Sequence, residues 1–406
     1  MRILQLCNKP PYPPLEGGSI AMNNITQGLL DAGHELKVVA ISSFKNEVNI
    51  DEFPKEYLDK TKFESVFVDL RIKPKAAFIN LFSKNSYHVQ RFISLNFENK
   101  LKQILGEETF DIVQLETLFM TPYIKVIRQF SDAKIVLRSH NIEHLIWKRV
   151  AKFEKNALKR WYINRLATTL SNYEKKTINQ YDGIASISKK DIEYFIKEGC
   201  IKPITDITFG IDVENFNTNN SSLKESQISL FHIGAMNWIP NQEGIKWFLV
   251  NVWQDINAIF NNLELYLAGR KMPEWLLNST YPNVIIKGEV EDSKEFVNSH
   301  SIMIVPLFSG SGLRIKIIEA MALGKTVIST TIGAEGINYT NNENIIIADS
   351  KEEFISAITT CIDNPEFCKT IGLNASKLIK AEHNNRIITQ RLVSFYEDLI
   401  LNPKVI

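Results

Sequence analysis

Residues 303–336 most constrain what this chain can fold into, because a buried strand, a glycine turn and a helix follow one another there without a break. The apolar run over residues 301–307 predicts a parallel strand, and the turn Gly310-Ser311-Gly312 after it carries almost no side chain. A helix is expected over residues 313–323, and a second buried strand over residues 325–330. This order of elements is typical of a doubly wound parallel α/β sheet.

The turn and the helix also form a pattern that suits a phosphate. Backbone N–H groups of a glycine turn and the positive end of a helix dipole favour an anion above the strand ends. Arg314 and Lys316 place two cations in the expected first helical turn, where they oppose the dipole unless an anion binds nearby. Glu319 on the same helix could accept hydrogen bonds from a ribose diol. The alternative is an ordinary β-α-β turn with charges on its surface.

A second pattern of the same kind opens the chain. Residues 2–7 predict a strand, Gly17 and Gly18 predict a loop that a ligand can approach closely, and residues 20–32 predict an amphipathic helix. A strand expected over residues 35–41 completes the β-α-β unit. The alternative for the two glycines is a plain loop.

The next strands carry polar residues at their carboxyl ends, the edge at which doubly wound sheets bind ligands. Residues 110–115 predict one strand, followed by Glu116, and residues 134–138 predict another, closely followed by His140. We therefore expect His140 to be functional, although a lone histidine is more often structural. The other six histidines show no partner spacing and are interpreted as structural: His34, His88, His144, His232, His300 and His383.

Two domains are expected, since 406 residues exceed the size of one ordinary core. The N-terminal domain is predicted to span residues 1–212, and residues 213–227 have the Asn- and Ser-rich composition of a linker. A second β-α-β series over residues 228–384 predicts another doubly wound domain. A last helix is expected over residues 385–401, within the C-terminal segment 385–406.

Composition argues against several classes of protein. The 47 basic and 46 acidic side chains nearly cancel, which argues against a general nucleic-acid-binding role. No apolar segment is long enough to span a bilayer, so we expect a cytoplasmic protein. Four cysteines lack the spacing of metal ligands and predict free thiols, most of them buried: Cys7, Cys200, Cys361 and Cys368.

Two stretches, residues 66–102 and 145–177, are both basic and aromatic. The second is expected to be one long helical stretch that could lie on an anionic membrane surface, at the inner face of the cytoplasmic membrane. The alternative for both stretches is a solvated helical face.

Together these motifs resemble family 4 of the glycosyltransferases, retaining enzymes with the GT-B fold. The resemblance covers nearly the whole chain and rests on Glu16-Gly17-Gly18, Arg138-Ser139-His140-Asn141, His232-Ile233-Gly234, Gly288-Glu289-Val290, residues 310–330 and Gly333-Ala334-Glu335-Gly336. It implies two doubly wound Rossmann-like domains facing a cleft, with the last helix crossing back to the N-terminal domain. It also implies a nucleotide-diphosphate sugar, such as a UDP- or GDP-sugar, held by the C-terminal domain. The acceptor would bind the N-terminal domain, with no metal or other cofactor required.

By this resemblance, Glu319 corresponds to the second glutamate of a Glu-x7-Glu motif, which binds the ribose hydroxyls. The first glutamate falls at Ser311, so contacts to the donor sugar are expected to shift to neighbouring groups. The loop has a Gly-x-Gly-x-Arg-x-Lys form, which marks a subgroup of the family and supplies cations that the common pattern places near Ala235 and Asn241. The resemblance implies a wider donor-binding set, with His140 close to the donor sugar: Gly17, Gly18, Val290, Gly310, Ser311, Gly312, Leu313 and Glu319.

A departing nucleoside diphosphate gathers negative charge, so Arg314 and Lys316 are expected to act mainly by stabilising the leaving group. No acidic pair can be assigned as nucleophile and acid, which favours the front-face mechanism of the family. The expected reaction is retaining transfer of a sugar to a glycan or lipid-linked acceptor, in cell-surface polysaccharide or glycoconjugate synthesis. Two alternatives remain, a sugar-nucleotide epimerase of the same architecture and a non-catalytic nucleotide-sugar-binding protein.

Overall fold

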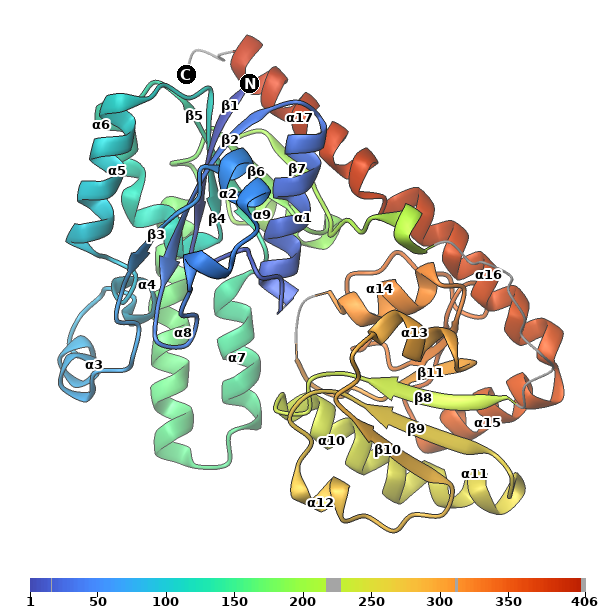
Figure 1. Cartoon of the computed structure of the whole chain (residues 1–406). Helices are drawn as coiled ribbons and strands as arrows, with labels where there is room; N and C mark the ends of the chain where they lie inside the picture. The colour runs from blue at the N-terminus through green and yellow to red at the C-terminus, as the bar shows by residue number, and fades with distance from the viewer. Residues whose placement is uncertain (16, 217–227, 311–312, 403–406) are drawn as a thin grey trace. The chain divides into compact units, whose positions relative to one another are not determined.

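The computed structural model describes residues 1–15, 17–216, 228–310 and 313–402 (Figure 1). The chain forms two compact units: the first holds Met1–Gly210 together with Asn385–Ile406, and the second is Ile211–Asn384. The sequence placed the first boundary after residue 212. Most of the expected linker, residues 217–227, lies outside the described residues, and Val213–Phe216 before it form a short 3-10 helix.

The first unit is built on a seven-stranded parallel sheet with the order β3-β2-β1-β4-β5-β6-β7. The central pair, β1 and β4, runs in register from Ile3 beside Ile112 to Cys7 beside Glu116, and the strand order reverses between them. The strands are β1 (Arg2–Cys7), β2 (Glu35–Ser42), β3 (Glu64–Phe67), β4 (Ile112–Glu116), β5 (Lys134–Ser139), β6 (Gly183–Ser186) and β7 (Ile204–Asp206).

Helices cover both faces of this sheet, which is why its central strands are almost continuous apolar runs (Figure 1). The helices of the first unit are α1 (Gly17–Asp31), α2 (Lys55–Thr61), α3 (Pro74–Asn80), α4 (Tyr87–Gln90), α5 (Leu95–Glu107), α6 (Ile124–Phe130), α7 (Glu143–Phe153), α8 (Ala157–Thr177), α9 (Lys189–Lys197) and α17 (Asn385–Leu401), with 3-10 turns at Ile50–Glu52 and Leu118–Tyr123.

The last helix, α17, has the bounds that the sequence predicted and belongs to the first unit. It packs against α1, and its apolar side chains Ile388, Leu392 and Tyr396 are buried in one cluster with Ile3 and Leu29. The C-terminal segment therefore completes the hydrophobic core of the N-terminal sheet, as the resemblance implied.

The expectation of one long helical stretch over residues 145–177 was wrong. The structure divides it into α7 and α8, which pack against each other as a hairpin (Figure 1). Asn156 starts α8, because its side-chain oxygen accepts a hydrogen bond from the backbone N–H of Lys159 at 3.0 Å. An asparagine is a strong N-cap signal, so the sequence carried the information for this break.

The second unit repeats the doubly wound plan with a six-stranded parallel sheet of order β10-β9-β8-β11-β12-β13, again reversing at its centre between β8 and β11. Its strands are β8 (Ser229–Ile233), β9 (Glu264–Ala268), β10 (Val284–Gly288), β11 (Ile302–Val305), β12 (Thr326–Ser329) and β13 (Ile346–Ile347). Its helices are α10 (Ile239–Phe248), a π-turn (Leu249–Trp253), α11 (Gln254–Ile259), α12 (Glu274–Leu277), α13 (Ser293–Asn298), α14 (Ile315–Ala322), α15 (Lys351–Asp363) and α16 (Pro365–Glu382).

Three further observations apply to the described part of the chain. None of its helices combines the length and the apolarity that crossing a membrane requires. No group of three or more His, Cys, Asp or Glu side chains there is arranged to hold a metal ion. The cysteines are free thiols, with Cys7, Cys361 and Cys368 buried and Cys200 half-buried.

Candidate functional site

In the second unit, two loops meet at the point where the strand order reverses. Trp238 follows β8, and Gly310 follows β11. Gly310 has a φ of +105°, and a Cβ atom there would lie 2.8 Å from the Trp238 ring. Only glycine satisfies both the backbone conformation and the close approach. The carboxyl edge of these central strands is where doubly wound sheets bind ligands.

Arg314 lies at the same edge. The structure starts α14 at Ile315, two residues later than predicted, so that Arg314 is the N-cap residue and not part of the first turn. Its guanidinium carbon lies 5.0 Å from the centroid of the Trp238 ring, within the range of a cation–π contact. The aromatic ring therefore supports the guanidinium beside the glycine turn.

Lys316 and Glu319 form an ion pair on the first turns of α14. The Lys316 Nζ lies 2.7 Å from Glu319 Oε2 and donates a hydrogen bond to Ser293 Oγ at 3.2 Å. Their side chains are 38% and 19% exposed, so water and ligands can reach the pair. An exposed pair at this spacing contributes only about 0.2–0.5 kcal/mol, so a ligand that offers each partner a better contact can replace it.

Other predicted donor residues belong to the same unit. Val290 lies half-buried in the loop between β10 and α13, the helix whose first residue, Ser293, binds Lys316. Leu313 is half-buried and lies against Gly336, where a Cβ atom would be 3.1 Å from Leu313 Cδ1. Ser311 and Gly312, which the sequence assigned to donor binding, lie outside the described residues.

Asn241 stands near the place where the common family pattern has a lysine, and it has a structural role here. Its side chain is buried, and its Nδ2 donates to the Ala235 carbonyl at 3.0 Å. It therefore fixes the turn after β8. Of the two cations predicted in the first helical turn, Lys316 lies on α14, whereas Arg314 lies at its N-cap.

In the first unit, Gly17 and Gly18 form the first turn of α1 and not a loop before it, so the predicted helix start at residue 20 was late. A Cβ atom at Gly18 would lie 3.0 Å from the Nζ of Lys9. The missing side chain thus lets the Lys9 ammonium cross the start of the helix. Glu16, the third residue of this motif, lies outside the described residues.

His140 follows β5 at the carboxyl edge of the first sheet and is held by a buried carboxylate. Its Nε2 lies 2.6 Å from Glu116 Oε2, which also accepts from Arg138 Nη1 at 3.3 Å. The His140 side chain is 11% exposed, whereas Glu116 and Arg138 are fully buried. His140 is therefore the member of this cluster that a ligand could touch.

The charges of this cluster follow from burial and pairing. Burial alone would raise the pKa of Glu116, but Arg138 and the hydrogen bond from His140 outweigh it and lower the pKa to about 2. Burial lowers the pKa of His140 below 6.5, against the opposing effect of Glu116. At neutral pH, Glu116 is ionised and His140 is neutral. The Nε2 then carries the proton donated to Glu116, and Nδ1 is left as an acceptor.

Glu116 is also tied to the interior of the sheet. Its Oε1 accepts from Gln5 Nε2 at 2.8 Å and from Gln114 Nε2, and Gln114 in turn accepts from the hydroxyl of Tyr396 on α17. Such a network satisfies a buried carboxylate that would otherwise cost several kcal/mol. The sequence placed Glu116 at the correct strand end but did not assign it a role, because its partners lie far away along the chain.

The histidines interpreted as structural lie inside the two units. His232 is buried, and its Nδ1 donates to the Ile304 carbonyl at 2.9 Å. His88 stacks on Trp147 with ring centroids 4.2 Å apart. His144 has a carboxylate partner that the sequence analysis missed, since Nδ1 hydrogen-bonds to the buried Glu174 thirty residues later.

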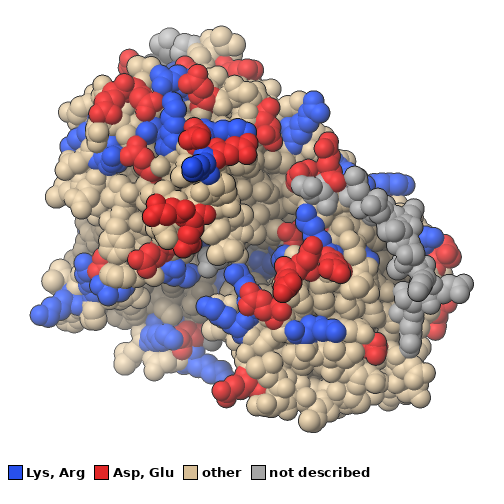
Figure 2. Space-filling view, viewed as in Figure 1, with Lys and Arg blue, Asp and Glu red and all other residues tan. Residues whose placement is uncertain are grey.

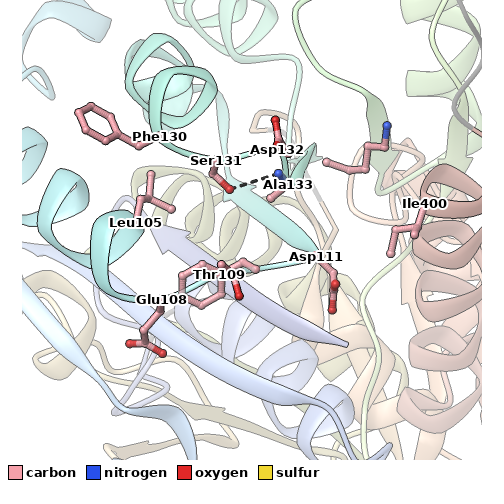
Figure 3. Close-up of a pocket in the computed structure, with 11 residues that line it drawn as sticks. Leu105, Glu108, Thr109, Asp111, Phe130, Ser131, Asp132, Ala133 and Ile400 are labelled. Atoms are coloured by element: carbon pink, nitrogen blue, oxygen red, sulfur yellow. Dashed lines mark hydrogen bonds between the residues drawn. The ribbon is translucent and has the colours of Figure 1, made fainter.

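A cavity of about 330 Å³ opens at the opposite edge of the first sheet, where β4 and β5 begin (Figure 3). Two of its acidic groups, Asp111 and Glu108, serve the fold. Asp111 accepts from the backbone N–H of Arg2 at 2.7 Å, and Glu108 binds the Arg2 guanidinium at 3.0 Å. Ser131 accepts from the backbone N–H of Ala133 at 3.2 Å. We assign no ligand to this cavity, because it lies at the amino ends of the strands, whereas doubly wound sheets bind ligands at the carboxyl ends.

Comparison with known proteins identifies part of the chain. Residues 227–364 match the family model of glycosyl transferases group 1. The second unit therefore contains a segment similar to a group 1 glycosyltransferase domain. This segment includes Gly310, Arg314, Lys316 and Glu319, whereas His140 lies outside the matched residues.

Three similar proteins extend the comparison. An uncharacterized 44.6 kDa protein in the cps region of Klebsiella pneumoniae is 23% identical over 400 residues, which cover 95% of this chain and 97% of the relative. Sucrose-phosphate synthase from Thermosynechococcus elongatus superposes with a TM-score of 0.71 at 15% identity, covering 99% of this chain and 100% of the other. The HepE protein of Anabaena, solved in complex with UDP, gives a TM-score of 0.66 at 14% identity, covering 98% of this chain and 100% of the other.

These likenesses show the two-domain α/β architecture of the GT-B fold, and with the group 1 domain they support a glycosyltransferase. The expectations of a GT-B fold and of a glycosyltransferase class are therefore confirmed. The predicted site residues divide between the units, with His140, Gly17 and Gly18 in the first and the others in the second.

Proposed function

We propose that this glycosyltransferase is a retaining, metal-independent enzyme of family 4 that transfers a sugar from a nucleotide-diphosphate sugar to a glycan or lipid-linked acceptor. The observation that carries the proposal is the group of Arg314, Lys316 and Glu319 at the strand-reversal edge of the glycosyltransferase domain. Two cations, a carboxylate and a glycine turn are the groups that a diphosphate and a ribose require.

The exposed Lys316–Glu319 pair supports this assignment of roles. A diphosphate would attract the Lys316 ammonium, and the released Glu319 carboxylate could accept hydrogen bonds from two ribose hydroxyls. Charge-assisted hydrogen bonds of this kind contribute about 1.5–3 kcal/mol, which exceeds the energy lost when the exposed Lys316–Glu319 ion pair breaks. Lys316 and Glu319 can therefore leave each other and bind the donor with a net gain.

Arg314 and Lys316 also suit the chemical step. The bond from the anomeric carbon to the diphosphate oxygen breaks as the acceptor oxygen forms its bond on the same face of the sugar. The leaving phosphate takes the acceptor proton, and the two cations stabilise the charge that grows on it. His140, held neutral by burial, would accept one hydrogen bond at Nδ1 from a hydroxyl of the donor sugar and would carry no charge.

The acceptor and the cellular setting are inferred from less direct support. The Klebsiella relative in a cps region supports a role in cell-surface polysaccharide or glycoconjugate synthesis. The local excess of Lys and Arg on the first unit suits an anionic acceptor and peripheral contact with the inner face of the cytoplasmic membrane. The GT-B neighbour bound to UDP makes a UDP-sugar the first donor to test.

A donor screen tests the proposal directly. UDP-, GDP-, ADP- and dTDP-sugars are compared for thermal stabilisation with and without EDTA, since a ligand at 100 times its dissociation constant adds about 2.7 kcal/mol. NMR then follows the donor. Free nucleotide with a glycosylated product of unchanged anomeric configuration supports retention, an inverted product contradicts it, and an epimerised donor favours an epimerase. Failure of every donor to stabilise the protein would overturn the proposal.

A further inference from the structure

The helix α3 has an arrangement of side chains that is unusual for a soluble surface. Among its described residues the polar Asn80 is buried, whereas Phe78 and Ile79 are 63% and 69% exposed. The Asn80 Nδ2 donates to Gln90 Oε1 at 2.8 Å and to the Asn85 carbonyl at 3.1 Å, which fixes the helix to the protein by its polar side. The apolar side of α3 is therefore held outward.

Exposed apolar side chains continue from α3 onto the neighbouring helix α8. Phe82 is 82% exposed, and its ring lies 5.7 Å from that of Phe78. On α8, Arg165 donates to the carbonyls of Leu81 and Ser83 at 3.2 and 3.0 Å. These hydrogen bonds join α8 to the residues on both sides of Phe82. Trp161 lies one turn before Arg165 on the same side of α8 and is 60% exposed.

The exposed apolar side chains of α3, of the segment after it and of the adjoining part of α8 form a surface that we name the apolar surface: Phe78, Ile79, Phe82, Leu158 and Trp161. Exposed apolar residues that stand singly are common on soluble proteins, but a cluster that includes three aromatic rings marks an interaction site. Each member is at least 60% exposed, so the protein itself does not cover it.

Basic side chains surround the apolar surface. Residues 71–97 contain five Lys or Arg and no Asp or Glu, and residues 144–173 contain seven Lys or Arg and one acid, Glu154. Lys159 neutralises that acid, with its Nζ 2.7 Å from a Glu154 oxygen. The helices α3, α7 and α8 lie in the part of the first unit where Figure 2 shows Lys and Arg, with fewer acidic residues, among uncharged surface. A partner here must therefore be both anionic and apolar.

We propose that the apolar surface inserts into the interfacial region of an anionic lipid bilayer, with the basic side chains of α3, α7 and the start of α8 bound to lipid headgroups. Aromatic and aliphatic side chains next to Lys and Arg are the combination that binds to and enters the headgroup region. The inference rests on the proposed function and deepens its membrane contact. It identifies an apolar anchor, where sequence analysis identified only basic charge.

Vesicle sedimentation tests the anchor without relying on glycosyl transfer. The full-length protein is incubated with phosphatidylcholine vesicles, either pure or containing about one third phosphatidylglycerol. We expect binding to the anionic vesicles that persists in part at high salt. Trp fluorescence should be quenched by vesicles with brominated acyl chains, and Trp161→Phe should lose most of that quenching. A protein that stays in the supernatant at low salt would overturn the proposal.

Matched variants separate insertion from charge alone. The triple variant Phe78→Ser, Ile79→Ser, Phe82→Ser should bind anionic vesicles at least about tenfold more weakly. The control Leu95→Ser, Ile201→Ser changes side chains of the same unit that are 75% and 76% exposed, and it should bind like the unchanged protein. Unchanged vesicle binding by the triple variant would overturn the apolar anchor.

Two further measurements distinguish the membrane anchor from a dimer interface and from the donor site. If gel filtration shows self-association that the triple variant abolishes while its vesicle binding is unchanged, the occupant is a second copy of the chain and the proposal fails. UDP-sugar stabilisation is measured on every variant. Normal vesicle binding without any donor binding would contradict the proposed function and leave the anchor standing, and the reverse result would contradict the anchor alone.

Discussion

The two sheets share the order of their first six strands but carry ion pairs of opposite character at their reversal points. In the first unit, Glu116 is buried with Arg138 and His140 and receives further hydrogen bonds from the sheet. In the second unit, Lys316 and Glu319 form a pair that solvent reaches. A buried, satisfied pair fixes geometry, whereas an exposed pair can exchange partners with a ligand. We infer that the buried pair in the first unit orients a neutral His140. We also infer that the exposed pair in the second unit separates when the donor binds.

The largest effect should come from Glu116→Gln, which leaves the Arg138 charge buried without its partner. Breaking a buried pair costs about 3–5 kcal/mol, so unfolding in urea should occur at a clearly lower concentration. Because Glu116 is a positioning residue for His140, kcat should fall more than KM rises, and the pH dependence of kcat should shift. The exposed pair Lys60–Glu56 supplies the control, since Glu56→Gln should leave the urea midpoint nearly unchanged. Equal effects of the two variants would remove the distinction between buried and exposed pairs.

The next effect concerns the chemical step. Arg314→Ala and Lys316→Ala should each lower kcat by about 10²–10³-fold, because they remove a charge that stabilises the leaving diphosphate. Affinity for the nucleoside monophosphate should fall much less. Isothermal titration with UMP and UDP, beside steady-state kinetics, measures both. Equal losses for the two nucleotides would indicate that these cations lie on the surface without contacting the diphosphate.

Sequence patterns predicted the strands and helices that form both sheet edges better than the side-chain contacts at those edges. Buried apolar runs and the α17 helix were predicted because they depend on local periodicity. The contact between Gln5 and Glu116 could not be predicted, since it joins strands more than a hundred residues apart. The Lys316–Glu319 pair could have been predicted from its i,i+3 spacing. The exposure of Phe78 required the tertiary contacts of Asn80, which turn the apolar side of α3 outward.

A third prediction uses a second buried carboxyl group, close to His140 in the chain. Burial and the nearby Glu174 raise the pKa of Glu143 to about 8. The unfolded chain loses this proton near pH 4.5 and the native protein keeps it, so native stability should fall as pH rises from 4.5 to 8 and then level off. Glu143→Gln should remove this loss, on the order of 4 kcal/mol at pH 8. Urea unfolding at pH 5, 6.5 and 8 (roughly even steps across the window) measures it, with the exposed Glu193→Gln as control. A slope that survives in Glu143→Gln would assign the pH dependence to other groups.

The smallest change in stability should accompany a clear change in function at the exposed edge. Glu319→Gln removes a pair that contributes about 0.2–0.5 kcal/mol, so the unfolding midpoint should barely move. The same substitution removes a charged acceptor for the ribose hydroxyls. It should weaken binding of the nucleotide-sugar donor by about 1.5–3 kcal/mol, or roughly 10- to 150-fold in Kd. A double-mutant cycle with Lys316→Met separates the two effects: the coupling energy should be small in unfolding and larger in UDP-sugar binding, where both side chains contact one ligand. If Glu319→Gln binds the donor normally, the ribose assignment fails. If the coupling in unfolding reaches several kcal/mol, the pair is structural, and the second edge resembles the first.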